Sequence, residues 1–158
     1  MIYMHYAGIK GDVSEPHHKE WLKLDSASFH AVREALNDEG QGEQRQGGSV
    51  TISDLTVTKP MCHGSADLFL ASVVGFSKEV KIHFTRTGHT GQVKYLEIVL
   101  HNCCVTNYSL SSTGTRHEES LSLNFTKIVL THHGQKEDLS EGTGKSEGFD
   151  IPSGKALN

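Results

Sequence analysis

The chain has 158 residues and a formal net charge of −4, with 35% hydrophobic and 22% charged residues. A chain of this length is most simply one domain, here residues 1–158, and it can bury a core without disulfides or bound metal. The composition excludes a disordered chain, and the mild charge provides neither the basic face that nucleic acid requires nor an acidic tail.

The first third of the chain predicts two strands and a loop. Residues 2–7 mix apolar and aromatic side chains and end at a glycine, which predicts a strand that runs into a turn. A second strand is predicted over residues 20–29, where Leu22 and Leu24 mark one face. Residues 33–48 are polar and glycine-rich, so we expect an extended surface loop. A loop of this length without secondary structure is usually either functional or disordered.

The next strand, over residues 50–59, changes its alternation partway. Apolar side chains occupy even positions up to Ile52 and odd positions from Leu55 onward. The change of phase falls near Ser53 and Asp54 and predicts a bulge or bend there. The proline that follows cannot donate a ladder hydrogen bond, so it should end the strand.

One helix is predicted, over residues 66–74, with Ser65 as its N-cap and Gly75 at its C-terminal end. Phe69 and Leu70 each begin an apolar i, i+4 pair, so the helix is apolar around most of its circumference and we expect it to be largely buried. If it is, truncating Phe69 or Leu70 to alanine should lower the free energy of unfolding by about 3–5 and 2–5 kcal/mol respectively.

The second half of the chain is dominated by strand patterns. Apolar alternation predicts strands over residues 80–85, 93–105, 105–110 and 119–131. The last changes phase near residues 126–127, which implies curvature, and residues 93–105 are apolar on both faces, as in a strand covered on both sides. Residues 133–158 form a polar, glycine-rich tail whose apolar patch, residues 148–152, could dock on a sheet edge as a short strand.

These elements indicate a mainly β fold, a small closed or nearly closed antiparallel β-barrel with one short α-helix packed on its outside and a long extended loop. The three cysteines, Cys62, Cys103 and Cys104, form no even disulfide framework and are interpreted as core residues of a chain that folds in a reducing compartment. No signal peptide is visible, and no apolar run approaches the roughly 18 residues of a membrane helix.

Eleven histidines raise the question of a metal site. The histidine pairs at residues 17–18 and 132–133, and the sequence H-N-C-C at 101–104, consist of neighbours whose side chains diverge on a strand. No recognised ligand spacing occurs. We therefore interpret the histidines as surface and rim residues, and we expect neither a metal site nor a cofactor.

No motif indicates catalysis. Glu118 and Glu119 are neighbours on a predicted strand, so they face opposite ways and cannot act as an acid and base pair on one face. We interpret them as charges that protect an edge strand from aggregation. Because no nucleophile motif is present either, we expect that the chain is not an enzyme.

Several stretches, in this order and spacing, resemble the haemolysin-coregulated protein (Hcp) family, the tube protein of bacterial type VI secretion. They are Y-M-H-Y-A-G-I-K-G-D from residue 3, H-K-E-W-L-K-L-D-S-A-S-F from 18, V-T-I-S-D-L-T-V-T-K from 50, S-A-D-L-F-L-A from 65, V-K-I-H-F-T-R from 80 and V-K-Y-L-E-I-V-L from 93. The resemblance extends from Met1 to about Thr131. One departure is Phe29-His30, where the family usually has an aromatic residue and then a glycine.

The resemblance implies hexameric rings that stack into a hollow tube, which a contracting sheath expels together with its spike. It further implies that the partners are other copies of the chain, the sheath, spike and baseplate proteins, and small effectors held in the lumen, without nucleic acid and without insertion into a membrane. The chain would reside in the bacterial cytoplasm and then be secreted without a cleaved signal peptide.

The resemblance also suggests interaction residues. The extended loop would pack against a neighbouring subunit or the next ring through Gly40, Gln41, Gly42, Glu43, Gln44 and Arg45, and Ser28 would face the lumen. The alternatives are that the loop is a passive connection and Ser28 an ordinary strand serine. The alternative function is a soluble β-barrel module that binds a small ligand or metal, with the histidines at its mouth.

Overall fold

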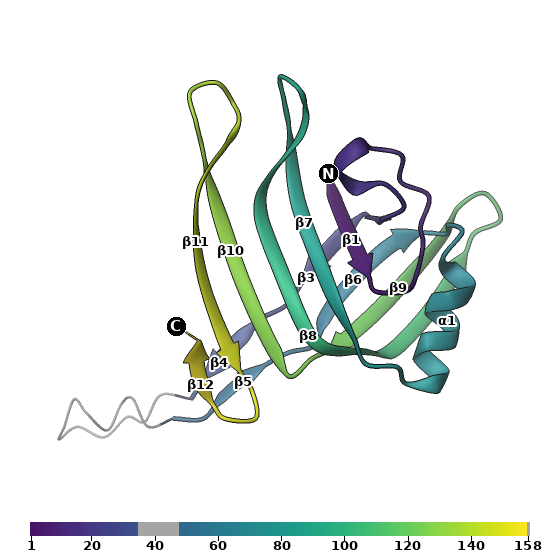
Figure 1. The fold of residues 1–158 in the computed structure, drawn as a ribbon. Coiled ribbons are helices and arrows are strands. Elements are labelled where there is room, and N and C mark those ends of the chain that lie inside the picture. The colour runs from purple at the N-terminus through teal and green to yellow at the C-terminus, as the bar shows by residue number, and fades with distance from the viewer. Residues whose placement is uncertain (35–47, 158) are drawn as a thin grey trace.

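Two antiparallel sheets that share one long strand enclose the core in the computed structural model, which describes residues 1–34 and 48–157 (Figure 1). The main sheet has the order β12-β11-β10-β8-β7-β1-β2, and the second has the order β3-β6-β9-β8. The strands are β1 (Ile2–Tyr6), β2 (Leu22–Leu24), β3 (Ser26–Ser28), β4 (Ala31–Arg33), β5 (Val50–Ile52), β6 (Leu55–Pro60), β7 (Lys78–Gly88), β8 (Gly91–Ser112), β9 (His117–Asn124), β10 (Lys127–Gln135), β11 (Glu141–Asp150) and β12 (Lys155–Leu157). The helices are the 3₁₀ turn η1 (Pro16–His18) and α1 (Ser65–Val74).

Strand β8 passes from one sheet to the other. Its first half pairs with β7 and β10, and its second half pairs with β9. The two halves meet at Asn102, whose φ of 51° lies in the left-handed region that asparagine tolerates better than most residues. The sequence predicted two separate strands here, and the structure has one continuous strand with a corner.

A second corner lies at Asp25, between β2 in the main sheet and β3 in the second sheet. The predicted strand 20–29 is thus divided between two sheets. With β8 and the β2–β3 segment both connecting the sheets, the architecture is the nearly closed antiparallel β-barrel that the sequence predicted.

The bend predicted near Ser53 and Asp54 is confirmed. Strand β5 before it pairs only with β4, while β6 after it lies between β3 and β9. The phase change near residues 126–127 likewise separates β9 from β10. Each change of phase in the sequence therefore marks a point where the chain bends and begins to pair with different strands.

The core lies between the inward faces of the two sheets. Alternate side chains along β1, β2, β6, β7, β8 and β9 supply it, as the period-2 pattern predicts. Its fully buried members include Met4, Leu22, Leu55, Val57, Ile82, Leu100, Cys103, Leu121 and Leu123. All three cysteines are free, and Cys103 alone of them is fully buried.

The polar segment 133–158 is folded to a greater extent than the sequence indicated. Strand β10 continues to Gln135, β11 pairs along its length, and β12 adds a further edge strand. A Cβ atom added at Gly148 would lie 2.9 Å from Leu157 Cδ1, so this glycine allows β12 to approach. Apolar alternation missed these strands because their side chains are mostly exposed, and backbone pairing of β11 to β10 and of β12 to β11 holds them.

Candidate assembly surfaces and a histidine-lined pocket

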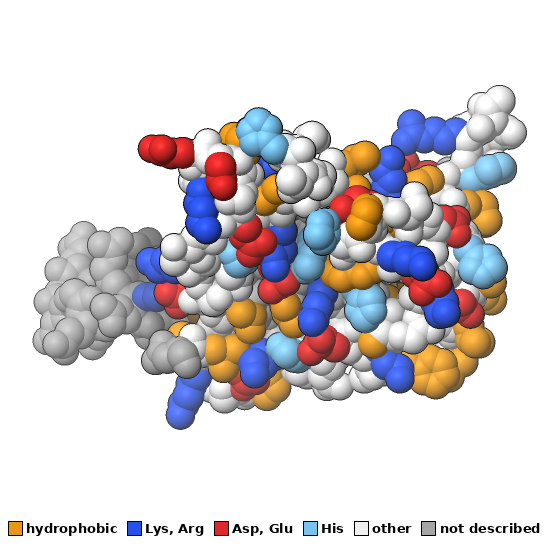
Figure 2. Space-filling view, turned by 45° about the horizontal axis from the view of Figure 1, so that its top comes forward, with side chains coloured by type: hydrophobic (Ala, Val, Ile, Leu, Met, Phe, Trp, Pro, Cys, Tyr) orange, Lys and Arg blue, Asp and Glu red, His pale blue; other side chains and the backbone are white. Residues whose placement is uncertain are grey.

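Helix α1 presents an exposed apolar surface at one side of the barrel. Phe69, Leu70, Val73 and Val74 of the helix, together with Phe76 after it, are 48–64% exposed, and we call these five residues the α1 patch. Figure 2 shows apolar side chains along the right-hand edge of the molecule, the side on which Figure 1 places α1. Contiguous apolar surface of this kind on a folded chain marks an interaction site.

The prediction that α1 is largely buried is therefore wrong for the single subunit. Only Ser65, Leu68 and Ala71 of the helix are buried, because just one side of it packs on the barrel. Gly75 ends the helix as predicted, with a φ of 78°. Ser65 is not the N-cap, since its hydroxyl instead accepts the Cys62 backbone N–H at 2.9 Å.

A buried polar cluster lies beneath this helix. The Lys59 ammonium and the Glu119 carboxylate form an ion pair, and both side chains are fully buried. Lys59 Nζ also donates to the Pro60 carbonyl at 2.7 Å, and the Tyr108 hydroxyl donates to Glu119 Oε1 at 2.5 Å. Burial and the bond to Glu119 raise the pKa of Tyr108. The Tyr108 ring in turn contacts Phe69, with ring centroids 5.9 Å apart.

The expectation that Glu119 protects a strand edge is wrong. Strand β9 lies between β6 and β8, and Glu119 pairs directly with Lys59 across the ladder. A sequence signal for this cluster existed: Lys59 continues the alternation of Leu55 and Val57, and Glu119 shares the phase of Leu121.

Strands β4 and β5 form a separate two-stranded ribbon. Val32 and Val50 on it are 55% and 45% exposed. An isolated two-stranded ribbon is at best marginally stable in water, so contact with another surface would favour it. The predicted contact residues Gly40, Gln41, Gly42, Glu43, Gln44 and Arg45 follow β4 and lie outside the described residues.

Ser28 is the last residue of β3, where it pairs with Thr56 and its side chain is exposed. A side chain in this position can face a channel or bulk solvent. Ser28 lies three residues before Ala31, where β4 of the ribbon begins.

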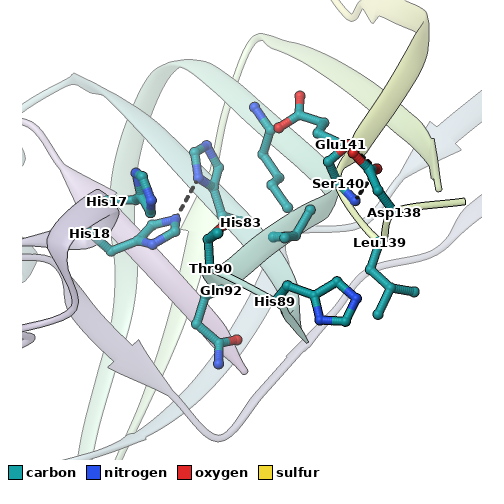
Figure 3. Close-up of a pocket in the computed structure, with 12 residues that line it drawn as sticks. His17, His18, His83, His89, Thr90, Gln92, Asp138, Leu139, Ser140 and Glu141 are labelled. Atoms are coloured by element: carbon teal, nitrogen blue, oxygen red, sulfur yellow. Dashed lines mark hydrogen bonds between the residues drawn. The ribbon is translucent and has the colours of Figure 1, made fainter. Parts of the chain in front are cut away.

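A pocket of about 580 Å³ opens between the η1 turn, the β7–β8 hairpin and the connection from β10 to β11 (Figure 3). Four histidines line it: His17, His18, His83 and His89. The interpretation of the histidines as surface and rim residues is wrong for His18, which is 3% exposed because aromatic side chains enclose it.

A chain of hydrogen bonds runs through the buried side of this pocket. His18 Nδ1 lies 2.5 Å from Glu15 Oε2, His18 Nε2 lies 2.9 Å from His83 Nδ1, and His83 Nε2 lies 2.7 Å from Glu97 Oε2. One of the dashed lines in Figure 3 joins the imidazoles of His18 and His83. Trp21, the single tryptophan of the chain, contacts both rings, with centroids at 4.8 and 4.6 Å.

This pairing could not be read from the sequence, because His18 and His83 are 65 positions apart. Across residues 1–34 and 48–157, no three His, Cys, Asp or Glu side chains are grouped as a metal would need. None of the helices in that part of the chain combines the length and apolarity that a bilayer crossing requires.

Comparison with known proteins relates the chain to one protein family. The sequence model of the family "Type VI secretion system effector, Hcp" matches residues 3–132. Protein hcp1 of Pseudomonas aeruginosa is 25% identical over 146 residues, which cover 90% of this chain and 89% of the relative.

Solved structures agree on the fold. A structure of a type six secretion system protein superposes with a TM-score of 0.89 at 20% identity, covering 99% of this chain and 98% of the other. Hcp1 from Salmonella typhimurium gives a TM-score of 0.78 at 18% identity, with 99% and 97% covered. From the family match over most of its length, the chain belongs to the Hcp family of type VI secretion, as a subunit of the secretion tube.

Proposed function

We propose that this chain assembles into hexameric rings, that the rings stack end to end as the inner tube, and that the α1 patch is the surface covered by the neighbouring copy within a ring. The observation that carries the proposal is the exposed apolar side of α1 on a member of a self-assembling family. A patch on one copy that meets a different surface on the next makes a heterologous contact, which yields a closed ring when the rotation closes.

The β4–β5 ribbon is proposed to act between copies as well. Figure 1 places it at the end of the barrel opposite the turn of the β7–β8 hairpin, so it extends beyond the barrel wall. From there residues 40–45 would reach a neighbouring subunit or the next ring. Ser28, exposed at the end of β3, would face the lumen and the small effectors carried there.

The finer assignments follow from family membership. Proposed partners are the contractile sheath, the spike, the baseplate proteins and small effectors, and neither nucleic acid nor membrane insertion is part of the proposed function. The protein would act as a structural component without catalysis, and it would leave the bacterial cytoplasm through the secretion machine without a cleaved signal peptide.

We expect the purified protein to run as a single species with six times the 17.3-kDa mass of the chain, and to do so without bound metal. Size-exclusion chromatography with light scattering measures the mass, and elemental analysis of the same fraction measures the metal. A monodisperse monomer would contradict the ring. Stoichiometric zinc would instead favour the alternative of a β-barrel module that binds a small ligand or metal.

Deleting residues 40–46 should weaken ring stacking and secretion while the thermal unfolding of the isolated subunit changes little. The deleted residues are polar, and the free energy of closing a loop changes by only about 0.6 kcal/mol for each doubling of its length. Many copies acting together would amplify the loss of one contact per subunit. Electron microscopy of tubes, secretion assays and subunit melts measure the three quantities; normal tubes and normal secretion would reduce the segment to a passive connection.

A further inference from the structure

The hydrogen-bond chain through His18 and His83 requires more protons than two neutral imidazoles carry. Its three consecutive bonds run from Glu15 to His18, from His18 to His83 and from His83 to Glu97. Each bond needs one hydrogen, whereas two neutral imidazoles supply two N–H groups and ionised carboxylates supply none. The array is complete only when it holds a third proton.

The surroundings assign that proton to His18. Burial opposes ionisation of Glu15, yet the hydrogen bond from His18 holds the pKa of that carboxyl below its usual value. Burial likewise opposes ionisation of Glu97, yet the hydrogen bond and charge of Lys94 hold its pKa low. Burial lowers the pKa of His83 to about 4, although the bond to Glu97 acts in the opposite direction, so His83 is neutral near pH 7.

His18 then donates from both nitrogens, Nδ1–H to Glu15 and Nε2–H to His83, and His83 donates its Nε2–H to Glu97. Aromatic rings enclose the cation. Tyr3 stacks on the His18 ring at 4.5 Å with an interplanar angle of 20°, and Trp21 lies at 89° to it. Ring faces stabilise a neighbouring cation.

The His18–His83 bond connects two parts of the molecule. Among the described residues, the backbone hydrogen bonds of residues 13–19 close within residues 11–21. The bond to His83 joins this segment, which contains η1, to β7 of the main sheet. The remaining titratable or charged groups around the pair are His5, His17, Lys23, Lys81, His89, Asp138 and Glu141.

We propose that the His18–His83 pair is a pH-dependent latch: it holds the η1 segment on the main sheet while the third proton is bound, and it releases the segment when that proton is lost. Without the proton, two hydrogens remain for three contacts. If both contacts with the carboxylates are kept, two nitrogen lone pairs face each other at 2.9 Å. The stabilisation is present at the lower pH and is lost as pH rises, because the third proton completes the hydrogen bonds of the docked array and has no such role in the released segment. All the residues belong to one chain, so the latch requires no residue of a neighbouring copy.

The first test measures ring protonation directly in the wild-type protein. Imidazole ¹⁵N NMR at pH 6, assigned with His18→Gln and His83→Gln, should show His18 protonated on both nitrogens and His83 protonated on Nε2 alone. Two neutral imidazoles at a pH where amides of the η1 segment are protected from hydrogen exchange would overturn the proposal, since the segment would then be docked without the additional proton on His18.

The second test uses Trp21 as a reporter, because it touches both rings and is the single tryptophan. Between pH 5 and 9 its fluorescence should show one proton-linked transition, accompanied by a loss of amide protection in the η1 segment as the pH rises. His18→Gln should abolish the transition, and His17→Gln, a change at the exposed neighbour, should retain it. A transition that persists in His18→Gln would overturn the latch.

Discussion

Replacing Lys59 with methionine should lower the free energy of unfolding by about 3–5 kcal/mol, because the change leaves the Glu119 carboxylate buried without its partner. The hydroxyl of Tyr108 continues to donate to Glu119, but one neutral donor cannot replace the ammonium charge. Chemical denaturation followed by circular dichroism measures the loss.

A triple variant separates the charge from the packing. Lys59→Met, Glu119→Leu and Tyr108→Phe together remove every member of the cluster and leave apolar groups of similar volume, so stability should return to near that of the parent. Lys23→Met, an exposed lysine on β2, should change stability by no more than about 0.5 kcal/mol. A Lys59→Met protein as stable as the Lys23→Met control would show that the ion pair contributes nothing to folding.

The cluster also shows what limits prediction of burial from sequence. Charged residues are almost never fully buried unless they are paired, so their type argues for the surface even where alternation points inward. Lys59 and Glu119 are 60 positions apart, and the sequence does not show that their strands are neighbours. The alternation of the two strands indicates that both side chains point inward. Only the order of the strands in the sheet explains why these charged side chains can be buried.

Local signals did predict most of the barrel. The phase change near Ser53 and Asp54 identified a bend because the side-chain period of a strand is two, and a slip of one residue moves the apolar set to the other face. The continuity of β8 was not predictable in this way. Its corner at Asn102 depends on both sheets being present to pair with its two halves.

Strands β11 and β12 were recognised only as a possible short docking segment, for a different reason. The polar, glycine-rich sequence of β11 has almost no apolar face, and β12 has only three residues, so the alternation that identifies a half-buried strand is missing. Backbone hydrogen bonding of β11 to β10, and of β12 to β11, organises them instead. Residues 40–45 likewise have no apolar periodicity, so the family resemblance alone suggests them as contact residues.

Helix α1 illustrates a limit that applies to assembling proteins in general. A helix that is apolar around most of its circumference must be covered, but its sequence cannot distinguish coverage by its own core from coverage by a second copy. In the structure the barrel covers Leu68 and Ala71, while Phe69 and Val73 remain 53% and 64% exposed. The two sides of one helix should therefore respond to mutation in different ways.

Leu68→Ala should lower the free energy of subunit unfolding by about 2–5 kcal/mol, because it removes a fully buried side chain. Val73→Ser with Val74→Ser should instead leave subunit unfolding almost unchanged and convert the proposed hexamer to monomers. Both valines are more than half exposed, and valine and serine have similar helix propensities. Sedimentation velocity measures assembly, and denaturation of the monomeric fraction measures stability.

The control for assembly is Ala66→Ser, at an exposed position of α1 outside the patch, which should retain the hexamer. Phe69→Ala is a further test of the α1 patch. Because half of the Phe69 surface is already exposed, the substitution should lower the free energy of subunit unfolding by well under the about 3–5 kcal/mol of a core phenylalanine. Its effect on assembly should be large. A hexamer that survives the double serine substitution would exclude a neighbouring copy as the partner of the α1 patch and leave the outer proteins of the secretion machine as its candidates.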